Sequence, residues 1–119
     1  MLPDILIAVA IGIAGEVAAH VQRLWVYRRT LYPVVNVLVV FGIVMGSVAS
    51  LAGHLGAPVV FGLGFAIGLA YELLNFAVLD WWYFPDDRLY LLRGKLACAV
   101  GVSVGWGLVP AAVTLLRAR

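Results

Sequence analysis

Residues 10–16 read Ala-Ile-Gly-Ile-Ala-Gly-Glu, and residues 66–72 read Ala-Ile-Gly-Leu-Ala-Tyr-Glu. These two stretches hold the only glutamates of the chain, Glu16 and Glu72, and each lies inside a long apolar segment. An ionisable side chain in an apolar membrane segment is costly and is a functional-site hypothesis by default. The repeated acidic motif therefore indicates both how the chain is built and where its site lies.

The composition excludes an ordinary soluble domain. Hydrophobic residues make up 65% of the 119 residues and charged residues 12%, whereas soluble chains average about 25% charged residues. Each apolar segment has the roughly 20 residues that cross a hydrocarbon core. The sequence predicts an all-α integral membrane protein whose single domain, residues 1–119, crosses the lipid bilayer with four helices, at about residues 3–24, 33–53, 58–80 and 96–116.

A tandem duplication is predicted from matches at a fixed spacing. The two acids are 56 residues apart (72 − 16 = 56), and the same offset carries Trp25 onto Trp81. We expect two copies of a two-helix hairpin, at about residues 1–55 and 57–119. Because an even number of crossings separates the copies, they are parallel repeats, related by a pseudo-twofold axis along the membrane normal.

Basic residues predict the orientation of the chain. The first and third connections carry three each, including Arg23, Arg28 and Arg29 in the first. The C-terminal tail carries Arg117 and Arg119. By the positive-inside rule, loops one and three face the cytoplasm and both termini lie outside. The expected location is the cytoplasmic membrane, which in a bacterium is the inner membrane.

The third connection is open to two interpretations. Residues 86–95 form either a short helix in the membrane interface, with Leu89 and Leu92 facing lipid, or an ordinary polar loop. Aromatic side chains flank both basic connections and fit an interfacial belt. These aromatic residues are Trp25, Tyr27, Tyr32, Trp81, Trp82 and Tyr83.

Small residues predict how the helices pack. Lipid tails are as apolar as leucine, so association inside a membrane depends on close packing and polar contacts. Such glycines serve contacts within one chain or with a second copy, so a homodimer or a larger membrane-protein complex stays open. The small-xxx-small pairs are Gly42/Gly46, Gly64/Gly68 and Gly101/Gly105.

Candidate site residues follow helical spacing on the first and third helices. Side chains three or four residues apart share one helix face. Gly12 and Gly68 lie on the same faces as the acids, so we expect two glycine-lined faces that oppose each other. The candidate substrate- or ion-binding residues on these faces are Glu16, His20, Arg23, Glu72 and Asn75.

Three functions are compatible with these residues. The first is a proton- or cation-coupled carrier or permeation unit, because two nearby acids in a low dielectric would not both ionise. The second is a non-catalytic accessory or scaffold subunit of a larger membrane complex, in which Glu16 pairs with Arg23, and Glu72 pairs with Asn75, His20 or interfacial arginines. The third is a membrane enzyme that uses Glu16, His20 and Glu72 as acid, base or metal ligands.

We favour the carrier narrowly over the accessory subunit and both over the enzyme, and expect no catalytic residues, no cofactor and no nucleic-acid partner. The sequence lacks a phosphate-binding loop and a basic, aromatic surface for nucleic acid. Cys98 is the single cysteine, so no internal disulfide forms. At Glu16 the chain resembles the small multidrug-resistance transporters, which use an acid in the first of four spans. The other spans do not follow that family, and no family is assigned.

Overall fold

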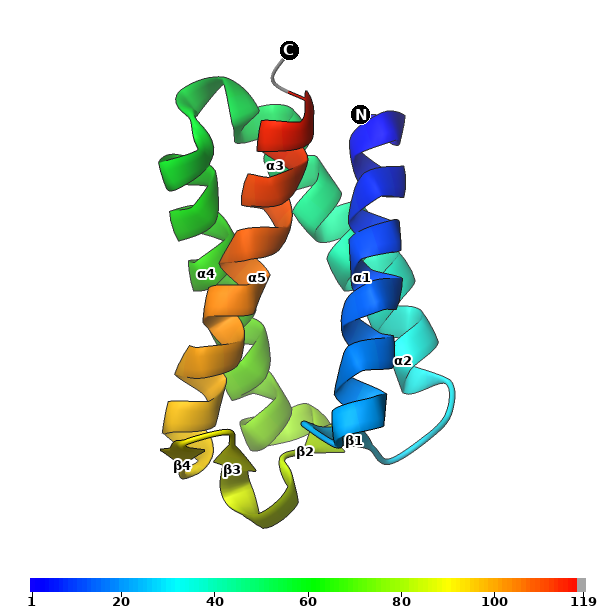
Figure 1. The fold of residues 1–119 in the computed structure, drawn as a ribbon, viewed down its shortest axis with the longest axis vertical. Helices are drawn as coiled ribbons and strands as arrows, with labels where there is room; N and C mark the ends of the chain where they lie inside the picture. The colour runs from blue at the N-terminus through cyan, green and yellow to red at the C-terminus, as the bar shows by residue number, and fades with distance from the viewer. Residues whose placement is uncertain (118–119) are drawn as a thin grey trace.

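A computed structural model describes residues 1–117 and arranges them as a bundle of four long helices (Figure 1). Each helix is long and apolar enough to cross a membrane. This confirms the predicted all-α class and the four helices, whereas Arg119 of the basic tail lies outside the described residues. The four spans are Leu2–Gln22, Tyr32–Leu55, Ala57–Leu79 and Lys95–Arg117.

Two of the spans change helix type along their length. The first and last, α1 (Leu2–Gln22) and α5 (Lys95–Arg117), are α-helical throughout. π-helical turns are rare and occur often at functional sites, and both π-helical segments here begin at an asparagine. The second span consists of α2 (Tyr32–Val35), the π-helical η1 (Asn36–Met45), α3 (Gly46–Ala52) and the 3-10 turn η2 (Gly53–Leu55). The third consists of α4 (Ala57–Leu74) and the π-helical η3 (Asn75–Leu79).

Each hairpin packs a large ring against a glycine. A Cβ on Gly12 would lie 2.6 Å from Cγ of Phe41, and a Cβ on Gly68 would overlap the side chain of Trp106. The two glycines are 56 residues apart (68 − 12 = 56). Phe41 and Trp106 then meet at the centre of the bundle, with ring centroids 4.5 Å apart. The expectation that the two glycine-lined faces oppose each other is therefore wrong, because the second helix of its own hairpin covers each of them.

The bundle core includes these two rings and extends from them toward the end of the helices that carries the chain termini. All of its buried side chains come from α1, η1, α3 and α5, and Tyr71 of α4 packs at its edge. α5 is central, because it packs against α4 along its length and also contacts α1 and α3. The buried members of the core are Ala8, Val37, Phe41, Met45, Ala49, Trp106, Val109 and Val113.

Two short strands join the hairpins at the end opposite the chain termini (Figure 1). β1 (Val26–Tyr27) follows α1, and β2 (Trp82–Tyr83) follows η3. They pair antiparallel, with Val26 opposite Tyr83 and Tyr27 opposite Trp82. Trp82 is buried in this arrangement, so its expected place in an exposed interfacial belt is wrong.

The third connection is not the interfacial helix that one interpretation expected. After a 3-10 turn, η4 (Pro85–Asp87), the strands β3 (Arg88–Leu89) and β4 (Leu92–Arg93) form a tight hairpin. Positive φ angles at Asp86, Asp87 and Tyr90 prevent a continuous helix. As a result Leu89 is buried beside Phe84 and Cys98, whereas Leu91 at the hairpin tip is 92% exposed.

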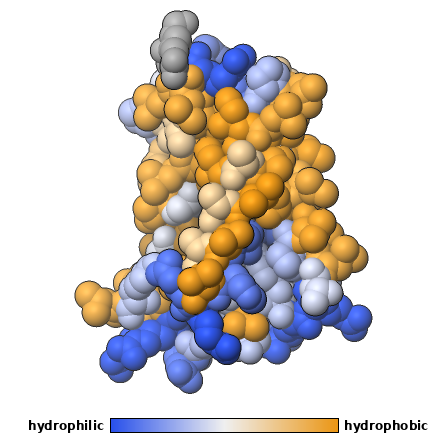
Figure 2. Space-filling view, turned by 45° about the vertical axis from the view of Figure 1, so that its right-hand side comes forward, coloured by the Kyte–Doolittle hydropathy of each residue, from blue (hydrophilic) through white to orange (hydrophobic). Residues whose placement is uncertain are grey.

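The surface separates apolar from polar residues along the bundle. Apolar side chains cover the middle of the molecule, and polar side chains gather at its two ends, more of them at the end with the short strands (Figure 2). Large exposed hydrophobic residues occur on every span, such as Leu6, Ile43, Leu63 and Leu108. A continuous apolar surface of this extent marks contact with lipid or with another apolar partner.

Candidate functional site

Glu16 is the centre of a cluster of hydrogen bonds at the basic-loop end of the bundle. Its Oε1 accepts hydrogen bonds from the Tyr27 hydroxyl at 2.8 Å and from Asn36 Nδ2 at 3.0 Å. Its Oε2 accepts a longer hydrogen bond, 3.4 Å, from Trp25 Nε1. All three partners donate, which suits an ionised carboxylate because it only accepts.

Asn36 connects the first hairpin to the second. Its amide donates both to Glu16 and to the Tyr27 hydroxyl oxygen, at 2.9 Å, and its Oδ1 accepts a hydrogen bond from the Tyr71 hydroxyl, also at 2.9 Å. The residue is 2% exposed and begins the π-helical segment η1. A buried amide with both ends satisfied specifies one arrangement of its neighbours.

The Tyr27 hydroxyl is held in its protonated form. Burial, and then the nearby Glu16 carboxylate, raise the pKa of this hydroxyl above its ordinary value of 10. The strand β1 fixes the position of Tyr27 through its pairing with β2, and the ring packs on Trp82 with centroids 5.8 Å apart. Tyr27 therefore remains a donor to Glu16 at physiological pH.

Glu72 is more deeply buried than Glu16 and has fewer partners. The residue is 1% exposed, and Trp82 Nε1 donates to its Oε1 at 3.3 Å. The buried Trp106 Nε1 has no hydrogen-bond partner among residues 1–117. Buried polar groups usually have good partners, so this poorly satisfied acid needs a functional explanation.

Trp82 connects the surroundings of the two acids. Its indole N–H donates to Glu72, and its ring packs against both Tyr27 and Tyr71, with centroids 5.8 Å and 4.9 Å apart. Tyr27 contacts Glu16 directly, and Tyr71 reaches it through Asn36. The two acids thus border one interior of aromatic and amide side chains.

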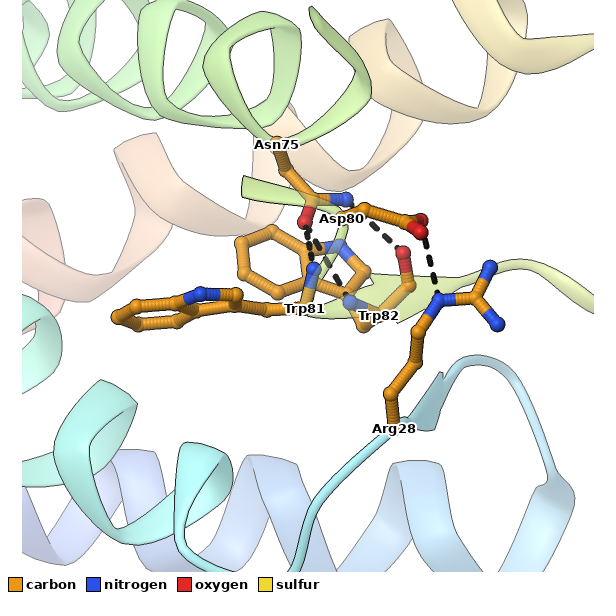
Figure 3. Close-up of polar contacts among 5 residues, drawn as sticks. All are labelled: Arg28, Asn75, Asp80, Trp81 and Trp82. Carbon is orange, nitrogen blue, oxygen red and sulfur yellow. Dashed lines mark hydrogen bonds and ion pairs between the residues drawn. The ribbon is translucent and has the colours of Figure 1, made fainter. Parts of the chain in front are cut away.

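Asn75 holds the backbone that positions Trp82 (Figure 3). Its Oδ1 accepts hydrogen bonds from the backbone N–H groups of Trp81 and Trp82 at 2.7 Å and 3.3 Å, and its Nδ2 donates to the Trp82 carbonyl at 2.9 Å. An ion pair of 3.0 Å between Arg28 and Asp80 spans the same junction. The amide of Asn75 is therefore used by the turn, and not by Glu72 as the scaffold interpretation expected.

A pocket of about 830 Å³ opens beside Glu16, and we call it the Glu16 pocket. It is formed by the last two turns of α1, the connection that contains β1 and the start of α2. Glu16 is the acid in its lining, and Trp25 and Tyr27 lie next to that acid. Four basic side chains also line it, namely His20, Arg23, Arg28 and Arg29.

The structure brings together three of the five predicted site residues. Glu16, His20 and Arg23 line the pocket, but His20 and Arg23 are exposed and form no hydrogen bond with Glu16 among residues 1–117. Glu72 and Asn75 lie in the interior behind it. Within the same residues, no three His, Cys, Asp or Glu side chains form a group that could hold a metal ion.

Five site residues lie outside the predicted set, namely Trp25, Tyr27, Asn36, Tyr71 and Trp82. Asn36 carried a usable signal, because a polar amide inside an apolar span is costly for the same reason as an acid. The sequence predicts Trp25, Tyr27 and Trp82 only as interfacial residues, and it indicates no role for Tyr71. Comparison of the chain with protein-family models, with curated protein sequences and with solved structures finds no match.

Proposed function

We propose that this protein is a small membrane carrier or permeation unit in which Glu16 is the cation- or proton-binding group. The observation that carries the proposal is that the Glu16 carboxylate faces an open pocket of about 830 Å³ while donors inside the bundle fix its position. Within residues 1–117, Oε2 accepts a single long hydrogen bond, from Trp25. Its remaining lone pairs are available to an incoming cation.

In this proposal Glu72 is the second binding group. It borders the same interior as Glu16, on the other side of Trp82. A packed core that includes Phe41, Met45 and Trp106 separates this interior from a smaller cavity of about 240 Å³ near the chain termini. The structure is then one state of a carrier, open at the basic-loop end, and transport requires the hairpins to rearrange around the acids.

The proposal includes a tandem duplication of the hairpin. The pairing of β1 with β2 supports it, since Val26 lies opposite Tyr83 and Tyr27 lies opposite Trp82. The offset of 56 makes Trp82 the repeat equivalent of Val26, and Tyr83 the repeat equivalent of Tyr27. Val26 therefore pairs with the equivalent of Tyr27, and Tyr27 pairs with the equivalent of Val26. Reciprocal pairing of this kind is what a twofold axis produces. The two glycines that pack against large rings, Gly12 and Gly68, keep the same offset of 56.

The proposed orientation places the Glu16 pocket on the cytoplasmic side of the inner membrane. The first and third connections lie together at one end of the bundle and both chain termini lie at the other (Figure 1). The pocket opens at the end that carries the basic connections. Because basic loops are retained in the cytoplasm, a cytoplasmic cation reaches Glu16 first.

Flux through proteoliposomes tests the carrier. The wild-type protein and its Glu16→Gln and Glu72→Gln variants are reconstituted, and the decay of an imposed proton or cation gradient is recorded. We expect wild-type flux to fall at least about tenfold in Glu16→Gln, since removal of one charge-assisted contact changes an equilibrium by that order. Asp86→Asn, which changes an exposed acid outside the pocket lining, is the matched control and should retain wild-type flux.

Two results would contradict the carrier. One is wild-type flux that Glu16→Gln leaves unchanged. The other is the lack of any flux of protons, alkali cations or organic ammonium ions above that of protein-free liposomes.

A non-catalytic subunit is the second candidate, and the packed core between the two cavities favours it. A protein with no continuous path needs no transport role, and its apolar surface can pack against other membrane chains. Gentle solubilisation from the native membrane distinguishes the two functions. A subunit should co-purify with larger chains in a fixed ratio, whereas a carrier should be recovered as a monomer or homo-oligomer.

A further inference from the structure

We infer that the Glu16 pocket binds the chemistry of an ethanolamine phosphate, with the primary ammonium at Glu16 and the phosphate at the arginines of the rim. This inference rests on the proposed role of Glu16 as a cation-binding group. It narrows the cation to an ammonium that is covalently joined to a phosphate.

The charges of the pocket favour a zwitterion over a simple ion. Glu16 lies at the inner wall, and Arg23 lies seven residues further along α1, about 10 Å along the helix axis. Arg29 and His20 also line the pocket. The basic rim disfavours a simple alkali cation relative to a zwitterion, and the acid disfavours a simple anion. A molecule that carries both charges is attracted by Glu16 through its positive group and by Arg23 through its negative group.

The unused hydrogen-bond acceptor capacity of Glu16 Oε2 favours a primary ammonium. Oε2 has room for another donor, because the hydrogen bond that it accepts from Trp25 is 3.4 Å long. A primary ammonium supplies N–H donors to such an oxygen, and a quaternary ammonium has none. Ethanolamine therefore suits this position better than choline.

The arginines favour a phosphate. A guanidinium presents a planar fork of N–H donors that matches phosphate oxygens. Arg28 is already engaged, since its Nε pairs with Asp80 and its guanidinium lies 4.8 Å from the ring centroid of Tyr83. Among residues 1–117, Arg23 and Arg29 form no ion pair, so these two are the arginines available to the phosphate.

The wall of the pocket gives access from the bilayer. Val17 and Val21 line it on α1 and are 57% and 75% exposed. They lie on the apolar surface of the first span, next to the basic connection where lipid headgroups lie. The same chemistry is presented by phosphatidylethanolamine in the membrane and by phosphoethanolamine in water, and the two sources can be distinguished.

Lipid retention measured by native mass spectrometry tests the inference. The purified protein is exchanged into micelles with equal amounts of phosphatidylethanolamine, phosphatidylcholine and phosphatidylglycerol. We expect wild type to retain phosphatidylethanolamine about tenfold over the other two, the effect of one charge-assisted hydrogen bond. Glu16→Gln should abolish this preference, and Arg23→Gln with Arg29→Gln should weaken retention of all three lipids. Arg88→Gln, in β3 and outside the pocket lining, is the control.

Competition identifies the source of the ligand. If excess soluble phosphoethanolamine displaces the retained lipid, the site accepts the free headgroup. If only added phosphatidylethanolamine displaces it, the ligand is the bilayer lipid. Either result supports the assigned chemistry.

Equal retention of the three lipids by wild type would overturn the inference, and so would an unchanged preference in Glu16→Gln. Thermal unfolding of each variant shows that it is folded, and the double arginine variant, which changes only exposed side chains, keeps the test available if Glu16→Gln unfolds. Because binding is measured without flux, selective retention by a protein that transports nothing would remove the carrier and leave this site.

Discussion

At the scale of single residues, the interior polar groups depend most on Asn36. One amide serves Glu16, Tyr27 and Tyr71, which come from three different segments of the chain. Asn36→Leu should lower the free energy of unfolding by about 1–3 kcal/mol, the cost of leaving buried polar groups without partners. Tyr71→Phe removes one neutral hydrogen bond and should cost about 0.5–1.5 kcal/mol.

Thermal or denaturant unfolding in detergent measures both changes. Because the two residues share a hydrogen bond, the double variant should be less destabilised than the sum of the single variants. Strict additivity would show that Asn36 and Tyr71 do not interact.

Gly68 provides a second test at this scale. A Cβ there would overlap Trp106, so Gly68→Ala should destabilise the bundle by about 1–3 kcal/mol, the usual cost of overpacking. Gly105→Ala is the matched control in α5, because no described atom lies within 4 Å of a Cβ at that position. Unfolding in detergent should separate the two variants, and equal effects would contradict the packing of Trp106 on Gly68.

The sequence identified residues whose chemistry is unusual for their surroundings. Glu16 and Glu72 are conspicuous because acids are rare in apolar spans. Tyr27 and Trp82 could not be identified in the same way, since aromatic residues near a membrane surface are common. Their role depends on how β1 and β2 turn back toward the bundle, and no local pattern specifies that.

At the scale of elements, the end of η3 and its junction with β1 decide where Trp82 lies. Asn75→Ala would leave the backbone N–H groups of Trp81 and Trp82 and the Trp82 carbonyl without their partner. We expect a loss of at least about 1–3 kcal/mol, together with faster amide hydrogen exchange at Trp82. Asp80→Asn removes an ion pair whose side chains are 47% and 69% exposed and should cost no more than about 1 kcal/mol.

Hydrogen exchange and unfolding distinguish these two variants of one junction. Similar losses for Asn75→Ala and Asp80→Asn would mean that the turn depends on its surface ion pair and not on the buried amide.

The long helices could be predicted from the sequence, and the short connections could not. Twenty apolar residues satisfy their own backbone hydrogen bonds only as a helix in lipid, so the four spans follow directly. Residues 86–95 combine three leucines with Arg88 and Arg93, a composition that suits an interfacial helix as well as a strand. The hairpin of β3 and β4 is selected by positive φ angles and by burial of Leu89, which depend on tertiary contacts.

At the scale of the whole molecule, the proposed orientation can be tested by chemical labelling. Single cysteines at Thr30, His54 and Leu91 are introduced into a Cys98→Ala background, since the native thiol is buried. With inside-out vesicles, a membrane-impermeant maleimide should label the cysteines at Thr30 and Leu91 and spare the one at His54. Right-side-out vesicles should give the opposite pattern, and labelling of all three positions from one side would contradict four crossings.

The arrangement of the four helices was predicted only in part. The number of helices follows from hydrophobicity, and the position of both basic connections at one end of the bundle follows from the number of crossings and from charge. The partner of each glycine face does not, because Gly12 and Gly68 suit any close neighbour. The large rings of Phe41 and Trp106 occupy those faces from within each hairpin, so the acids meet through side chains of the connections.

The Tyr71–Asn36 hydrogen bond sets an order of events during biosynthesis. Tyr71 follows Asn36 by 35 residues, so the ribosome delivers the first hairpin to the translocon before the hydroxyl that serves the asparagine has been translated. Until the third span is inserted, the nascent hairpin holds an amide oxygen in lipid without its native donor, which costs free energy. We therefore expect membrane quality-control proteases to degrade a product that is truncated before the third span.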